Sequence, residues 1–227
     1  NKFTGTNTDG EAALEPIRQQ LIESQNLTIG LLGFGGAGKA ILAFLLRDFK
    51  RKHKIHIFNR SPINIKDSKR SDLYSYSLND LETFLPHFDL LINATSVGHV
   101  ESIDITPIPT KLLAKAKNTM VVYDIIYDPL KTTLLKNSEE IGLRTINGLR
   151  MNLIQAVLAY SYTNQTVLAK EEIYKIMYHK RLQYETKHRF FWCIFSINSN
   201  ILGIAIFRFV FFTKSLVTLV SPPIKYI

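Results

Sequence analysis

A glycine-rich segment, Gly33-Phe34-Gly35-Gly36-Ala37-Gly38, has residue types and spacing suited to phosphate binding. It contains the pattern G-x-G-x-x-G, follows the apolar run 27–33, and precedes a stretch with helical periodicity. In that context the first glycine allows a tight turn, the second lets the backbone approach a pyrophosphate, and the third lets helix and strand pack closely. We therefore predict dinucleotide binding at this loop, with a purely structural turn as the alternative. The predicted cofactor-binding residues here are Gly33, Gly35, Gly36, Ala37 and Gly38.

The choice between the two nicotinamide dinucleotides is expected at the end of the next strand, which reads Asn59-Arg60-Ser61. NAD-specific sites usually place an acidic residue there to hold the ribose 2′-hydroxyl. This chain has no carboxylate at 59–61 that would repel a 2′-phosphate, and Arg60 can stack on adenine or pair with the phosphate. We therefore predict NADP as the cofactor, bound by Asn59, Arg60 and Ser61. An exposed arginine without a ligand is the alternative.

The elements that must position these residues alternate between strand and helix, which indicates an α/β fold. Near-continuous apolar runs are typical of buried parallel strands, and the longer segments show helical periodicity. We expect a Rossmann-like, doubly wound parallel sheet with closing C-terminal helices. Asp9 is expected to cap the first helix. The expected strands are 27–33, 54–58, 89–92 and 119–125, and the expected helices are 9–24, 37–51, 78–84, 148–163 and 168–182, with a proline-rich loop at 103–109.

Charge and cysteine content narrow the class of protein. The net charge is +9, but residues 178–227 contribute +6 of it, so the body of the chain is only weakly basic and nucleic acid is not an expected partner. The single cysteine, Cys193, excludes an internal disulfide framework and favours the reducing cytoplasm. Six scattered histidines include no pair at helical i, i+4 spacing, so no metal site is predicted.

The segment 184–227 differs from the rest, because it is both basic and strongly apolar. Residues 190–207 run without a charge, which is the lower limit for a transmembrane helix. Three interpretations stay open: read-through of an AT-rich stretch after a frameshift, a membrane anchor through 190–212, and an extension that packs or binds a partner. Membrane association is the less favoured of the first two.

Taken together, the motifs resemble the shikimate dehydrogenase family over about residues 3–183. They occur in the order and at the spacing of that family, which makes the resemblance specific. The matching segments are Gly5-x-Asn7-Thr8-Asp9-Gly10, the glycine loop, Asn59-Arg60-Ser61, Asn93-Ala94-Thr95-Ser96-x-Gly98, the stretch from Val122 to Leu135, and Asn147-Gly148-Leu149-x-Met151-x-x-x-Gln155-Ala156.

The resemblance implies an NADP-dependent enzyme that reduces 3-dehydroshikimate to shikimate reversibly, in the cleft between a substrate domain and a cofactor domain. Hydride moves between the nicotinamide and the substrate C3, and the C3 oxygen gains or loses a proton. The family uses a lysine and the aspartate of the Asn-Thr-Asp motif for that proton. Asp9 matches this aspartate, and the lysine is expected upstream of this chain. Asn7 is expected to contact substrate.

Other roles follow from the same resemblance, residue by residue. Tyr127 and Gln155 match substrate-contacting positions, with a core aromatic and an ordinary polar helix residue as the respective alternatives. The expected nicotinamide and ribose contacts are Thr95, Ser96, Ile125, Gly148 and Met151, of which Met151 is equally suited to core packing. Arg150 departs from the family pattern, which has glycine there.

We accordingly expect four regions: a remnant of a substrate domain with a linking helix at 1–26, a cofactor domain at 27–147, closing helices at 148–183, and the tail at 184–227. The chain is expected to be the C-terminal part of a longer enzyme, with an upstream 3-dehydroquinate dehydratase domain as one form of it, and to have little turnover alone. The alternatives are a non-catalytic NADP-binding remnant and a quinate/shikimate dehydrogenase relative.

Overall fold

The structure is a computed structural model that describes residues 7–24, 26–49, 53–65, 70–163 and 168–187. Contacts between residues divide the chain into two compact units, 1–177 and 178–227, and each is considered by itself. All the elements discussed below lie in the first unit, except that the last helix continues across residue 177.

Six parallel strands form one sheet in the order β3-β2-β1-β4-β5-β6. From β1 the chain adds β2 and then β3 on one side, and it then returns to add β4, β5 and β6 on the other side, so the strand order reverses between β1 and β4. That reversal is the topological switch point at which doubly wound folds bind dinucleotides. The predicted Rossmann-like α/β fold is therefore confirmed. The strands are β1 (Thr28–Leu32), β2 (Lys54–Asn59), β3 (Leu73–Ser77), β4 (Leu90–Asn93), β5 (Val121–Asp124) and β6 (Arg144–Ile146).

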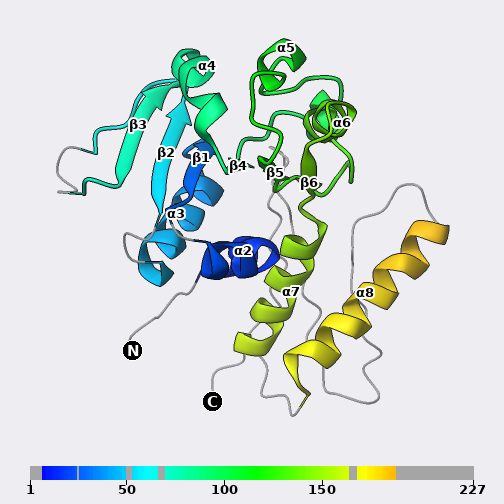
Figure 1. Cartoon of the computed structure of the whole chain (residues 1–227). Helices are drawn as coiled ribbons and strands as arrows, with labels where there is room; N and C mark the ends of the chain where they lie inside the picture. Colours follow the sequence, from blue (N-terminus) through cyan, green and yellow to red (C-terminus); the bar gives the residue numbers. More distant parts are fainter. Residues whose placement is uncertain (1–6, 25, 50–52, 66–69, 164–167, 188–227) are drawn as a thin grey trace, which may run out of the picture. The chain divides into compact units, whose positions relative to one another are not determined.

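Helices cover both faces of the sheet (Figure 1), and each face has its own apolar core. One core joins the sheet to α1, α2, α3 and α7, and the other joins it to α4, α5 and α6. The α-helices are α1 (Asp9–Leu14), α2 (Arg18–Glu23), α3 (Gly36–Asp48), α4 (Leu81–Phe84), α5 (Thr110–Leu113), α6 (Thr133–Glu140), α7 (Leu149–Thr163) and α8 (Lys170–Lys187); 3₁₀ turns are η1 (Glu15–Ile17), η3 (Leu78–Asp80), η4 (Leu85–His87) and η5 (Val100–Ser102).

The first predicted helix, 9–24, is wrong as a single element. It is divided into α1 and α2 by the 3₁₀ turn η1, which contains Pro16. Proline has no N–H for the helical ladder, and its ring clashes with the carbonyl four residues earlier, so a continuous α-helix is excluded there. The predicted cap is also wrong. Thr8 is the N-cap residue, without a side-chain cap bond, and Asp9 is the first helical residue.

Two strands and two helices were not predicted: β3, β6, α5 and α6. The segment expected as a helix at 78–84 is a short α4 between two 3₁₀ turns.

The tail from residue 188 onward lies outside the described residues. The three interpretations of this tail, including a membrane anchor through 190–212, therefore stay predictions. Among the helices that the structure describes, none is long and apolar enough to cross a membrane.

An aromatic cluster fills the sheet face under α4. The imidazole of His56 stacks on Tyr74 with ring centroids 4.7 Å apart, and Phe88 meets it edge-on at 5.7 Å. The rings of Tyr76 and Phe84 extend the cluster, with their centroids 4.2 Å apart. His56 is buried and its Nδ1 has no hydrogen-bond partner. Burial lowers the pKa of His56 to about 4, so its ring is neutral at pH 7.

Replacing this histidine by phenylalanine is expected to stabilise the fold. His56→Phe keeps the stacked ring and removes a buried nitrogen without a partner, which is worth about 1 kcal/mol at pH 8. Between pH 6.5 and about 4 the folded wild type binds fewer protons than the unfolded chain, so it loses stability as the pH falls. The variant lacks this loss, and its advantage should widen from pH 8 to pH 5 in urea unfolding. A difference in unfolding free energy between variant and wild type that stays constant with pH would contradict this account. So would an equal stabilisation by His179→Phe, which replaces an exposed histidine.

Candidate cofactor and substrate site

The glycine loop joins the end of β1 to the start of α3. Gly33 has φ +88°, a conformation that favours glycine, and its N–H donates to the carbonyl of Phe58 at 2.8 Å. A Cβ atom on Gly38 would lie 2.3 Å from the Gly33 carbonyl oxygen, so helix and loop touch through backbone. Around Gly35 and Gly36, by contrast, a Cβ would meet no heavy atom within 4 Å. The loop therefore presents open backbone at its centre.

This open backbone fits a pyrophosphate. Gly36 and Ala37 begin α3, a helix of 13 residues, and free N–H groups at a helix start attract anions. Gly35 and Gly36 are both exposed, and Ala37 is half-buried. A side chain at Gly35 or Gly36 would extend into the open space beside this helix start.

The predicted adenosine side of the site lies at the end of β2. Asn59 is the last residue of that strand, and its Nδ2 donates to the carbonyl of Ser61 at 3.2 Å, which holds the following turn. Arg60 and Ser61 are exposed. Arg60 forms no hydrogen bond or ion pair with the described part of the chain, so its guanidinium is available to an anionic ligand.

A buried polar network connects the carboxyl ends of β4 and β5. Asn93 and Asp124 are fully buried neighbours in the sheet, and the Asn93 amide donates to Asp124 Oδ1 at 3.1 Å. The Ile126 N–H donates to the same oxygen at 3.1 Å, and the Thr132 hydroxyl donates to Oδ2 at 2.8 Å. Asn93 Oδ1 in turn accepts from the backbone and hydroxyl of Thr95, at 3.1 and 2.7 Å. The network fixes the loop that carries Thr95.

Sequence reasoning missed the importance of Asn93 and Asp124, although both stand in the quoted motifs. A signal was present, because each is a polar residue at the carboxyl end of a buried apolar strand. Burial raises the pKa of Asp124 to about 6, against the lowering effect of its hydrogen bonds from Thr132, Ile126 and Asn93. A buried carboxyl with three donors is a structural anchor for the loops on either side.

The predicted nicotinamide side is formed where α7 starts against the end of β5. The Gly148 N–H donates to the Ile126 carbonyl at 3.0 Å, and a Cβ on Gly148 would lie 1.9 Å from the Ile125 carbonyl oxygen. Ile125 is half-buried, whereas Met151 is buried in the apolar core. Met151 is therefore chiefly a packing residue in this structure, the alternative that the sequence left open.

The glycine loop and the Thr95 loop lie against each other. A Cβ on Gly33 would approach Thr95 Cγ2 to 2.8 Å and the Ala94 carbonyl oxygen to 3.1 Å. Thr95 is half-buried and Ser96 is exposed beside it. The residues expected to touch the pyrophosphate and those expected to touch ribose or nicotinamide thus form one continuous edge of the sheet.

The predicted catalytic aspartate is joined to the predicted substrate-binding glutamine. Gln155 Nε2, on α7, donates a hydrogen bond to Asp9 Oδ1, on α1. Asn7 Oδ1 accepts from the Gly10 N–H at 3.2 Å and so holds the first turn of α1. Burial raises the pKa of Asp9, and a hydrogen bond from the Asn7 side chain opposes this shift. The carboxyl is half-buried, which leaves it a path to a ligand.

Close backbone contact fixes α1 against α3, the helix that starts at the glycine loop. A Cβ on Gly10 would lie 2.6 Å from the Ala40 carbonyl oxygen and 2.3 Å from the Phe44 ring. Ala40 is four residues beyond Gly36, about one helical turn. Asp9 is therefore held on a helix that packs beside the first turns of α3.

Tyr127 and Arg150 are the remaining positions that the sequence singled out. Tyr127 lies in the loop after β5 and is half-buried. Arg150, the departure from the family pattern, is exposed on the first turn of α7, and its guanidinium lies 3.7 Å from Glu15 Oε1. This ion pair links α7 to η1.

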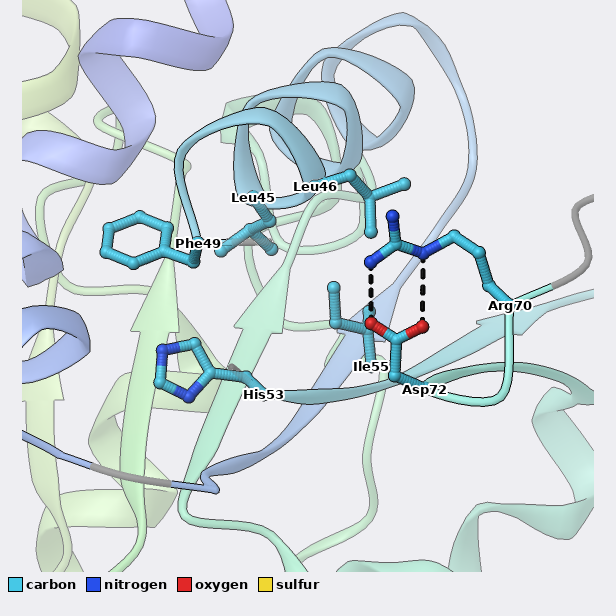
Figure 2. Close-up of a pocket in the computed structure, with 7 residues that line it drawn as sticks. All are labelled: Leu45, Leu46, Phe49, His53, Ile55, Arg70 and Asp72. Carbon is cyan, nitrogen blue, oxygen red and sulfur yellow. Dashed lines mark hydrogen bonds and ion pairs between the residues drawn. The ribbon is translucent and has the colours of Figure 1, made fainter. Parts of the chain in front are cut away.

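A small cavity of about 10 Å³ at the other end of α3 is a packing gap and not a ligand site (Figure 2). Its walls include Phe49, His53 and the ion pair of Arg70 with Asp72, in which Nη2 and Oδ2 are 2.6 Å apart. A space of this size holds at most one water molecule. Within the described ranges, no cluster of three or more histidine, cysteine or acidic residues could hold a metal ion.

Comparisons with known proteins agree with these motifs. No protein-family model matches the chain. The NADP(+) shikimate dehydrogenase of Bacillus licheniformis is 37% identical over 162 residues, which are 70% of this chain and 56% of that protein. The chain thus spans little more than half the length of this relative.

Solved structures give the same result for the fold. Shikimate 5-dehydrogenase from Thermus thermophilus, in complex with NADP(H) and shikimate, has a TM-score of 0.59 and 27% identity, covering 75% of this chain and 61% of that one. A chorismate mutase/shikimate 5-dehydrogenase fusion from Clostridium acetobutylicum has a TM-score of 0.58 and 26% identity, covering 78% and 62%. This chain is therefore a homologue of the shikimate dehydrogenases, as its motifs predicted.

Proposed function

We propose that the chain carries the cofactor-binding part of an NADP-dependent shikimate dehydrogenase, which interconverts 3-dehydroshikimate and shikimate. The observation that carries the proposal is the convergence of the family motifs on one edge of the sheet in a homologue of that family. The open backbone at Gly35 and Gly36 supports a pyrophosphate there. The half-buried Asp9, bonded to Gln155, supports proton transfer nearby.

The residues have two kinds of role in this proposal: some bind the cofactor or the substrate, and Asp9 transfers a proton. When bound, NADPH supplies the hydride. Gly33 to Gly38 hold the pyrophosphate, Arg60 pairs with the 2′-phosphate, and the Thr95 loop and Gly148 border the nicotinamide. Asp9 exchanges a proton with the substrate oxygen, together with the lysine that the family resemblance assigns to another segment. Gln155 orients the Asp9 carboxyl and, with Asn7 and Tyr127, contacts the substrate hydroxyls.

The cofactor assignment predicts a specific loss of NADP affinity when Arg60 is removed. Arg60→Ala deletes a charge-assisted pair with the 2′-phosphate, so the Kd for NADP should rise about tenfold while that for NAD changes little. Titration calorimetry with both dinucleotides measures this. Arg144→Ala, which removes an exposed arginine at β6, is the control and should leave both affinities unchanged. An unaltered NADP/NAD preference in Arg60→Ala contradicts the assignment.

The reaction is tested on the protein as its source cells make it, by following NADPH formation with NADP+ and either shikimate or quinate. Faster formation with shikimate supports the proposal, and faster formation with quinate favours the quinate/shikimate alternative. Tight NADP binding without turnover on either substrate favours the non-catalytic remnant. The intact mass of that protein reports whether further segments, such as a 3-dehydroquinate dehydratase domain, are joined to this chain.

The proposed setting is the cytoplasm, which the single cysteine supports. The proposed small-molecule partners are NADP and shikimate or 3-dehydroshikimate. The division of the chain into four regions stays a prediction. These regions are 1–26, 27–147, 148–183 and 184–227.

A further inference from the structure

A second cavity, of about 220 Å³, opens at the amino ends of β1 and β2, the sheet edge opposite the glycine loop. The first residues of these two strands are Thr28 and Lys54. They pair with each other in the sheet and lie at the border of the cavity. Its walls are aromatic and come from β2, β3 and the segment before β4. The aromatic wall residues are His56, Tyr74, Phe84 and Phe88, and the exposed His87 completes the lining together with Thr28 and Lys54.

The strand register explains why the walls of this cavity are flat. Gly30 pairs with His56 and has no side chain, and the Phe88 ring occupies its place, only 2.7 Å from where a Cβ would lie. On the neighbouring strand, Tyr74 pairs with His56 and stacks on it with an interplanar angle of 27°. The imidazole, kept neutral by its burial, acts as another flat aromatic surface.

The charge at the cavity border is positive. Lys54 is exposed there, its backbone N–H donates to the Leu27 carbonyl at 2.8 Å, and its ammonium forms no hydrogen bond or ion pair with the described part of the chain. Asp89, which bonds the first residue of β1, is already compensated, because its Oδ2 accepts from the Thr28 N–H at 2.7 Å and its Oδ1 pairs with Lys117. The Lys54 ammonium is therefore available to an anion, next to aromatic surfaces.

We propose that this cavity binds a single-ring aromatic carboxylate, with the ring between the aromatic walls and the carboxylate at Lys54. An apolar cavity of roughly 150 Å³ accommodates benzene, so the volume suffices for one ring with a substituent. Offset or edge-on contact with the wall rings favours an aromatic over a saturated ring. The site is separate from the proposed dehydrogenase function and does not depend on it.

The test is a titration of the full chain with benzoate, followed by the NMR signals of the His56 and Tyr74 rings. Benzoate should shift both, and cyclohexanecarboxylate and benzamide should bind more weakly, because the first lacks the aromatic ring and the second lacks the charge. Lys54→Met should weaken benzoate binding by about two- to fivefold, the range for an exposed ion pair, and leave benzamide unchanged. Lys136→Met, at an exposed lysine on α6, should change neither.

Three results would overturn the proposal: no shift of either ring with benzoate, equal affinity for cyclohexanecarboxylate, or equal effects of Lys54→Met and Lys136→Met. Both lysines are exposed, so both variants are expected to fold. NADP titration of the same samples keeps the two proposals apart. Absence of NADP binding would contradict the proposed cofactor site at the glycine loop. Absence of benzoate binding with NADP binding intact would contradict only the proposal for this cavity.

Discussion

Asp9→Asn is expected to slow shikimate-dependent NADPH formation by a factor of about 10² to 10⁴, the usual contribution of a positioned acid–base group. Asparagine has nearly the shape of aspartate and still accepts the hydrogen bond from Gln155, so α1 should stay in place. It has no ionisable proton to exchange with the substrate oxygen. The fall in rate should therefore occur without a change in NADP affinity. The assay compares rate and NADP titration in protein made by the source cells.

Glu11→Gln is the matched control for this prediction. Glu11 lies two residues further along α1 and is also half-buried, but it points away from position 9 by the helical period. Its replacement should leave the rate within a factor of two of the wild type. Equal losses in the two variants would indicate a general effect on α1, and a full rate in Asp9→Asn would remove Asp9 from the reaction.

Gly148→Ala is expected to lower the free energy of unfolding by about 3 kcal/mol, at the upper end of overpacking substitutions. The added methyl would lie 1.9 Å from the Ile125 carbonyl oxygen and 2.3 Å from its carbon. These are backbone atoms, so no side-chain rotation relieves the clash. The start of α7 must move away from β5, and the Gly148 hydrogen bond to Ile126 is strained or lost. Urea unfolding measures the loss of unfolding free energy, and the dependence of this free energy on urea concentration should stay unchanged.

Gly36→Ala provides the contrast, because its methyl would meet nothing within 4 Å and alanine favours a helix start. Its stability should stay within about 0.5 kcal/mol of the wild type. NADP binding should nevertheless weaken, since the methyl occupies the proposed pyrophosphate space. If Gly148→Ala were as stable as Gly36→Ala, the close approach of α7 to β5 would be refuted.

The central strands were predictable because burial on both faces demands uninterrupted apolar residues, and β1, β4 and β5 meet that demand. The strand β3 was missed because Leu73-Tyr-Ser-Tyr-Ser77 stands at the sheet edge, where one side of the ladder is free and serines are tolerated. The three residues of β6, which include an exposed Arg144, carry too short a pattern to identify.

The site was predictable at the level of residue types and less so at the level of contacts. The spacing of Gly33, Gly35 and Gly38 is local and encodes a backbone shape directly. The hydrogen bond between Asp9 and Gln155 joins positions 146 residues apart, and nothing in either local pattern specifies it. Asn93 and Asp124 are likewise 31 residues apart, and only the register of β4 with β5 brings them together.

The close packing of Gly10 on α3 has a consequence for motion. Because α1 meets α3 through backbone and meets α7 through the bond to Gln155, Asp9 shares one rigid frame with the glycine loop. Under the proposed function, the Asp9 carboxyl therefore keeps a fixed position relative to the dinucleotide held at the glycine loop. A substrate that binds beside this frame would then find the proton of Asp9 and the hydride of the dinucleotide in a fixed relation to each other.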